Sequence, residues 1–143
     1  MRSTHTPYDD WIMLCREACD RINAPEHAYT QSIQLIQDFQ KEHFIALYLN
    51  TRNRVVKKEV ISIGTLNANV VHPREVFRTA ISVSAAHIIV AHNHPSGDPT
   101  PSKEDITITK KLVEAGKIIG IEVLDHVIIG DERYHSMKEA GVI

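Results

Sequence analysis

The stretch AHNHPSGDPTPSKED, residues 91–105, combines two histidines one residue apart, a turn-forming segment and an aspartate where a helix should begin. Residues two apart in a strand lie on one face, roughly 6.5 Å apart along the chain, so His92 and His94 can bind one ion. Pro95 ends the strand, and the turn after it is expected to bring Asp105 back to the strand end. Two nitrogens and one oxygen leave a fourth tetrahedral position for water, which is typical of a catalytic zinc site.

The start of the helix has a second, local explanation. Ser102 and Asp105 have the spacing of a capping box, and Thr100-Pro101 offers a competing start with proline at the first helical position. Capping and metal binding do not exclude each other. Capping alone does not explain the two same-face histidines, so the combination predicts a metal site.

Two helices are predicted before the first strand. Apolar side chains recur at helical spacing in residues 11–22, WIMLCREACDRI. A second helix begins near Pro25, with Ile33, Ile36 and Phe39 on its inner face. We therefore expect a helical extension over residues 1–24 and the main domain over residues 25–143.

Strands and helices alternate in the rest of the chain. Residues 43–50, HFIALYLN, are typical of a buried strand, and residues 55–64 are the return strand of a hairpin. A helix from Pro73 leads into a second buried strand, residues 87–94, and the helix after it is expected to end near Gly116. The last strands lie in residues 118–130 and around Tyr134. This order predicts an α/β fold, a single-domain α-β-α sandwich with a mixed sheet.

Composition limits the classes of function. The chain has 143 residues, of which 43% are hydrophobic, enough for one domain with a real core. Its net charge of -2 gives no global attraction to nucleic acid or membrane. Cys15 and Cys19 stand four apart in a helical pattern, which favours small buried residues over a disulfide. With no signal peptide and no apolar run of membrane-spanning length, we expect a cytoplasmic protein.

The motif also resembles a known family. HNHPSGDPTPSKED is similar to the metal motif of the JAB/MPN (JAMM-motif) metalloprotease superfamily, His-x-His followed by Ser-x-x-Asp, with a glutamate upstream. LNTRNRVVKKEVISIGTLNANVVHPREVFRTAI and LDHVIIGDERYHSM resemble the RadC family, and the resemblance runs from about Glu42 to the C-terminus. It implies a cytidine-deaminase-like α-β-α sandwich, in agreement with the order of elements.

The resemblance implies roles by position. His92, His94 and Asp105 correspond to the zinc (Zn²⁺) ligands, and Ser102 to the residue that stabilises the developing oxyanion. Glu42, just before the first strand, is the candidate for the general base.

The position of the base departs from the family pattern. Glu42 lies four residues before Ala46 rather than three, and His43 occupies the three-back position. A solvated charge at a helix end is the alternative interpretation of Glu42.

The implied reaction is metal-assisted hydrolysis of an amide in a peptide or isopeptide-linked protein. Zinc would polarise the carbonyl and hold hydroxide, Glu42 would move a proton to the leaving amine, and Ser102 would donate to the oxyanion. Asp98 and Asp125-His126 are candidates to orient the ligands, with simple turn formation as the alternative for Asp98.

Two other classes of function are compatible with parts of this sequence. Zinc nucleobase deaminases need His-x-Glu and Cys-x-x-Cys, and this chain has neither at the motif. The RadC family carries a DNA-repair label, which makes a nucleic-acid-binding or protein-interaction module without catalysis the main alternative. Residues 1–63 contain no glycine, so a helix-hairpin-helix is not expected there. The predicted hairpin carries a basic cluster, for which solvated edge protection is favoured over phosphate contact: Arg52, Arg54, Lys57 and Lys58.

Overall fold

The computed structural model describes residues 20–64 and 71–143. A mixed five-stranded sheet in the order β2-β1-β3-β4-β5 forms its centre. β3 and β4 run parallel, and the other neighbouring strands pair antiparallel. The strands are β1 (His43–Leu49), β2 (Val55–Ile63), β3 (His87–Asn93), β4 (Glu122–Ile129) and β5 (Tyr134–Ser136).

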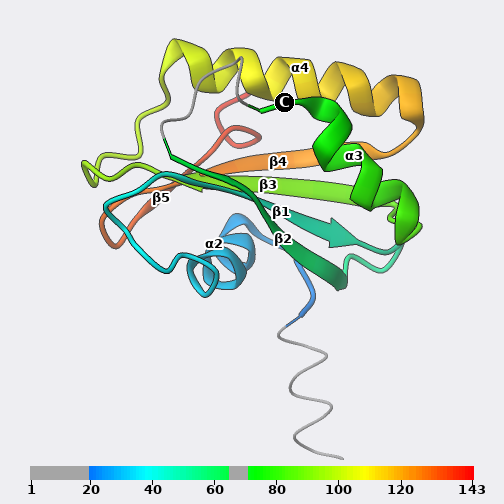
Figure 1. Cartoon of the computed structure of the whole chain (residues 1–143), viewed down its shortest axis with the longest axis horizontal. Helices are drawn as coiled ribbons and strands as arrows, with labels where there is room; N and C mark the ends of the chain where they lie inside the picture. The colour runs from blue at the N-terminus through cyan, green and yellow to red at the C-terminus, as the bar shows by residue number, and fades with distance from the viewer. Residues whose placement is uncertain (1–19, 65–70) are drawn as a thin grey trace, which may run out of the picture.

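Helices cover both faces of this sheet. α3 (Pro73–Ser82) and α4 (Lys103–Ile119) lie on one face, and α2 (Pro25–Ile33) lies on the other (Figure 1). Successive side chains of β1 point to opposite faces of the sheet and contribute to a hydrophobic core on each face. Phe44 packs on the α3/α4 side and Ile45 on the α2 side. Every residue of β1 is buried, which explains its unbroken apolar sequence. The predicted α-β-α sandwich is confirmed.

Two predicted helix features are wrong. Phe39 lies beyond the end of α2 with 54% of its surface exposed, so it is not on an inner helix face, although Ile36 is buried. α4 does not end near Gly116 but continues to Ile119, where Gly120 with φ of 86° caps it. Gly116 is needed for another reason, since a Cβ there would meet the carbonyl oxygen of Ile121.

Some sequence predictions concern residues outside the described ranges. The predicted helix over residues 11–22, with Cys15 and Cys19, lies almost entirely outside the described residues, and the division at residue 24 stays a prediction. Among the helices in residues 20–64 and 71–143, none is long and apolar enough to cross a membrane.

One edge of the sheet gathers the segments that carry the motif. The antiparallel register pairs Phe44 with His92, so the N-terminal end of β1 lies beside the C-terminal end of β3. The loop after β3 then leads into the N-terminus of α4 (Figure 1). The segments that carry Glu42, the two histidines and Asp105 are thereby brought to the same edge.

Candidate metal centre

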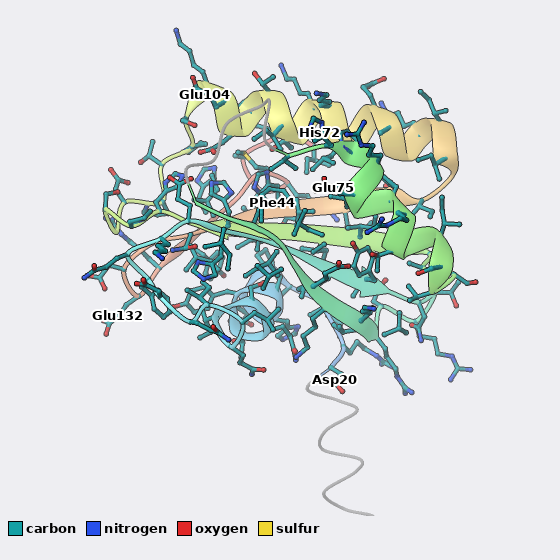
Figure 2. The ribbon with its side chains drawn as sticks, in the orientation of Figure 1. Asp20, Phe44, His72, Glu75, Glu104 and Glu132 are labelled. Atoms are coloured by element: carbon teal, nitrogen blue, oxygen red, sulfur yellow. The ribbon has the colours of Figure 1, made fainter. Side chains whose placement is uncertain are left out.

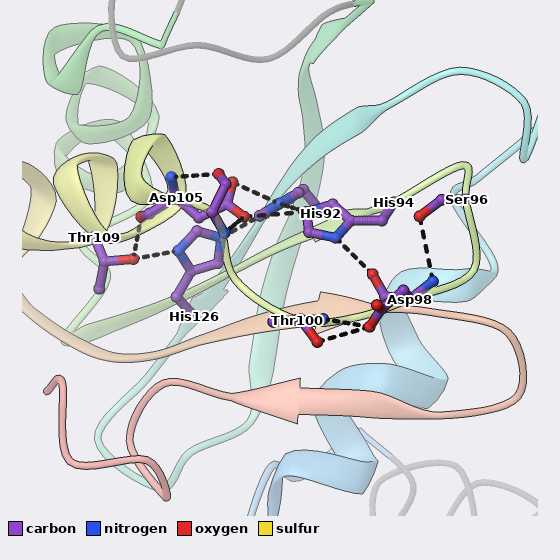
Figure 3. Close-up of polar contacts among 9 residues, drawn as sticks. His92, His94, Ser96, Asp98, Thr100, Asp105, Thr109 and His126 are labelled. Atoms are coloured by element: carbon purple, nitrogen blue, oxygen red, sulfur yellow. Dashed lines mark hydrogen bonds and ion pairs between the residues drawn. The ribbon is translucent and has the colours of Figure 1, made fainter.

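His92, His94 and Asp105 meet at one point (Figure 3). His92 belongs to β3, His94 follows it directly, and Asp105 lies in the first turn of α4. His92 Nε2 is 3.0 Å from His94 Nε2 and 3.1 Å from Asp105 Oδ1, and His94 Nε2 is 3.1 Å from Asp105 Oδ2. The exposed fractions of the three side chains are 0%, 15% and 5%. The residues predicted to bind a metal therefore form one nearly buried cluster.

The start of α4 fixes the carboxylate. The Asp105 backbone N–H donates to Ser102 Oγ at 3.1 Å, and the Ser102 backbone N–H donates to Asp105 Oδ2 at 2.8 Å. This capping box confirms Ser102 as the helix start and shows that capping and a position in the cluster coexist. Since Ser102 Oγ accepts in the cap, the proton of its exposed hydroxyl stays available for donation.

A chain of hydrogen bonds orients His92. Thr109 Oγ1 donates to the Asp105 carbonyl oxygen at 2.8 Å and lies 2.6 Å from His126 Nδ1. A hydroxyl has one proton and the carbonyl can only accept, so His126 Nδ1–H donates to Thr109. His126 Nε2 then accepts from His92 Nδ1–H across 2.7 Å. The remaining nitrogen of His92, Nε2, points into the cluster (Figure 3).

The protonation of His126 agrees with this direction of donation. Burial is the main reason that the pKa of His126 lies well below its ordinary value, and the neighbouring His92 lowers it further. A neutral ring has one donor and one acceptor nitrogen, as the chain requires.

His94 is oriented in a similar way from the loop. Its Nδ1 lies 2.8 Å from the carbonyl oxygen of Asp98, which can only accept, so Nδ1 carries the proton and Nε2 faces Asp105. The side chain of Asp98 makes the turn by accepting from the backbone N–H and the hydroxyl of Thr100. Asp98 therefore has both predicted roles, one through its backbone and one through its side chain.

The donor set suits a cation. The two Nε2 atoms and the two oxygens of Asp105 crowd together, and each needs a proton or a metal between it and its neighbours. Hydrogen bonding to Asp105 accordingly raises the pKa of His94. Burial alone would raise the pKa of Asp105, but hydrogen bonds with His92 and His94 outweigh it and hold that pKa far below its ordinary value. A divalent metal with nitrogen and oxygen preference can replace these protons.

Glu42 lies beside this cluster rather than in it. It lines a hollow of about 360 Å³ together with Ile63 and Pro95, and its charge contributes to the raised pKa of His94. His43, at the three-back position, is buried, and its Nδ1 bonds to the carbonyl oxygen of Lys41 at 2.8 Å. Of the two neighbours, Glu42 is therefore the one that faces the hollow next to the site.

Asn93 is a residue that the sequence analysis missed. Its Oδ1 accepts from the backbone N–H of His43 at 2.7 Å, and its Nδ2 donates to the carbonyl oxygen of Lys41 at 3.0 Å. Asn93 thus ties the segment that carries Glu42 to β3. No signal in the sequence marks this role beyond its place between the two histidines.

Asp125 and His126 have different roles, although they are adjacent. Both lie within β4 rather than near its end, and alternation turns their side chains to opposite faces. Asp125 accepts from Ser136 Oγ at 2.6 Å and from the Lys138 backbone N–H at 3.0 Å, which fastens the segment after β4. Of the pair, His126 contacts the proposed metal ligand His92, as predicted, whereas Asp125 does not.

Two basic residues of the hairpin lie on opposite faces of the sheet. Lys57 and Lys58 are consecutive in β2, so they point to opposite faces of the sheet. Lys58 Nζ approaches Gln34 Oε1 at 3.5 Å, on the α2 side. The interpretation of the basic cluster as edge protection stays a prediction.

Comparison with known proteins places the chain in a family. The family model described as RadC-like JAB domain matches residues 22–142. The chain is 54% identical over 123 residues to a UPF0758 protein of Methanosarcina mazei and 58% identical over 123 residues to one of Methanococcoides burtonii. Each alignment covers 86% of this chain and 54% of the relative, so the chain spans about half the length of the curated relatives it matches. The chain therefore belongs to the family of RadC-like JAB domains.

Proposed function

We propose that this domain is a zinc-dependent hydrolase of the JAMM type that cleaves a peptide or isopeptide bond. The observation that carries the proposal is the set of hydrogen bonds that turns both Nε2 atoms toward the carboxylate of Asp105. Zinc held by His92, His94 and Asp105 would polarise the scissile carbonyl and lower the pKa of a water molecule.

The protein residues supply the remaining steps. Glu42, in the hollow beside His94, takes the proton from the attacking water and passes it to the leaving amine. Ser102 donates its free hydroxyl proton to the oxygen on which negative charge develops. Thr109 and His126 keep His92 in the required tautomer.

Elemental analysis of protein purified without added metal tests the site first. We expect near one zinc per chain in the wild type and none in His92→Ala/His94→Ala. Peptide and isopeptide substrates can then be screened, with Glu42→Gln as the variant that keeps zinc and loses hydrolysis. A wild-type protein that holds no metal even after zinc is supplied would contradict the proposal.

A further inference from the structure

A second hollow, of about 380 Å³, opens next to the metal centre. Tyr29, Ile33 and Phe39 contribute an apolar wall to its lining, and Asp131 and Glu132 contribute an acidic side. His94 and Pro95 also line this hollow, and Pro95 is shared with the hollow that contains Glu42. An extended peptide that crosses the metal centre would therefore meet both hollows.

The acidic side of this hollow is held rigidly against the metal-binding loop. The Asp131 backbone N–H donates to the Gly97 carbonyl oxygen at 2.7 Å, and a Cβ on Gly97 would lie 3.0 Å from the Cβ of Asp131. A Cβ on Gly130 would lie 2.5 Å from the Gly97 oxygen. The two loops interlock through these glycines, so Asp131 keeps its place beside the loop that carries His94.

The apolar wall is fixed as well. The rings of Tyr29 and Tyr134 lie with centroids 5.5 Å apart, which joins α2 to β5. Asn93 Nδ2 reaches the carbonyl oxygen of Phe39 at 3.4 Å, so the segment beyond α2 is tied to β3. The hollow is thus bounded by elements that are anchored to the sheet.

The charge of the hollow is negative. Within residues 20–64 and 71–143, no ion pair engages the carboxylate of Asp131 or Glu132. Arg133 is not among the residues that line the hollow. Figure 2 shows Glu132 at the end of the molecule away from α3 and its Glu75. An aliphatic stem with a cationic head can pack on the apolar wall while its charge reaches the carboxylates.

We propose that this hollow is a substrate subsite for a lysine or arginine side chain adjacent to the scissile bond. The inference rests on the proposed hydrolase function, because it names a substrate class for that same centre. A norleucine side chain would pack on the apolar wall but offer no cation to the carboxylates. A glutamate side chain would be repelled by the carboxylates.

Binding of short peptides tests the subsite. Zinc-loaded Glu42→Gln protein, which should not turn over, is titrated in NMR spectra with Ala-Ala-X-Ala-Ala peptides in which X is lysine, arginine, norleucine or glutamate. We expect the lysine and arginine peptides to bind about two- to fivefold more tightly than the norleucine peptide. Adding Asp131→Asn/Glu132→Gln should remove the difference. Adding Glu75→Gln/Glu122→Gln, which removes the same charge elsewhere, should preserve it.

Every outcome separates the subsite from the hydrolase. The subsite would be overturned by equal affinities for the lysine, arginine and norleucine peptides, or by no peptide binding. It would also be overturned if the preference for lysine and arginine survived Asp131→Asn/Glu132→Gln. The same peptides are then offered to zinc-loaded wild type. Hydrolysis of all peptides at similar rates would support the hydrolase function and refute the subsite. Tighter binding of the lysine and arginine peptides without hydrolysis would support the subsite and contradict the hydrolase function.

Discussion

His126 Nε2 lies 2.7 Å from His92 Nδ1, and this contact decides which nitrogen of His92 is left for a metal. The direction of this hydrogen bond is set by the next one, in which Thr109 Oγ1 accepts from His126 Nδ1–H. The hydroxyl of Thr109 thus helps to orient the proposed ligand His92 without belonging to the proposed ligand set. Such outer hydrogen bonds usually affect metal affinity strongly.

Thr109→Val should weaken zinc binding about 10- to 100-fold. Valine keeps the shape of threonine but cannot accept from His126, so the ring loses its fixed tautomer. Thr109→Ser, which retains the hydroxyl, is the matched control and should bind zinc nearly as the wild type does. Competition with a chromogenic chelator measures both zinc affinities. Equal zinc affinities for the valine and serine variants would refute the role of the hydrogen-bond chain from Thr109 to His92.

Ser102→Gly should separate the cap from catalysis. Glycine is a tolerated N-cap, so we expect the free energy of unfolding to fall by only about 0.5 kcal/mol. Loss of the hydroxyl donor should lower kcat about 100- to 1000-fold. Denaturant unfolding and hydrolysis assays on the same preparation check the two effects. A glycine variant that keeps full activity would assign Ser102 to capping alone.

The stability of the metal-free protein and the stabilisation added by zinc should change in opposite directions with pH. The pKa of His94 is raised above 6.5, so its protonated form stabilises the metal-free fold below that pH, and this stabilisation is lost as pH rises through the raised pKa. The pKa of Asp105 is lowered below 3.8, so its contribution is lost only in acid, as pH falls below that value.

Zinc competes with the same proton, so its stabilisation should grow with pH. Calorimetry from below to above pH 6.5 should show the Tm of the metal-free protein falling relative to that of the zinc-loaded protein. His94→Gln should abolish this divergence. Parallel pH profiles for the two wild-type forms would argue against His94 as a ligand.

Asn93→Ala should damage catalysis more than metal binding. It leaves the backbone N–H of His43 without its partner, while the carbonyl oxygen of Lys41 keeps its contact with His43 Nδ1, so the free energy of unfolding should fall by about 1 to 3 kcal/mol. The segment that carries Glu42 would lose its tie to β3, so kcat should fall while zinc affinity stays near the wild-type value. Chelator competition and hydrolysis assays distinguish this result from general loss of structure, in which both would fall together.

The local part of the site could be predicted from the sequence. The histidines, the turn and Asp105 are close along the chain, so strand and helix geometry are enough to bring them together. The role of Asn93 and the choice of His126 over Asp125 could not be predicted in this way. They depend on the register of β3 against β4 and β1, which pairs segments 34 and 50 residues apart in their contacts.

The errors in helix length have a related cause. A glycine can end a helix through a left-handed residue or permit a close approach within it, and spacing alone does not distinguish the two. Gly120 does the first and Gly116 the second. The prediction for Phe39 extends the helical period beyond Ile33, where α2 ends.

The difference in sequence separation has a consequence for the order of assembly. The three proposed ligands lie between residues 92 and 105, a short loop whose closure costs little entropy. Glu42 arrives only when β1 docks on β3, a contact between distant parts of the chain that is slower to form. If the domain is the proposed zinc hydrolase, a partly folded chain would capture zinc before Glu42 is in place, and during unfolding activity should disappear before the metal is released.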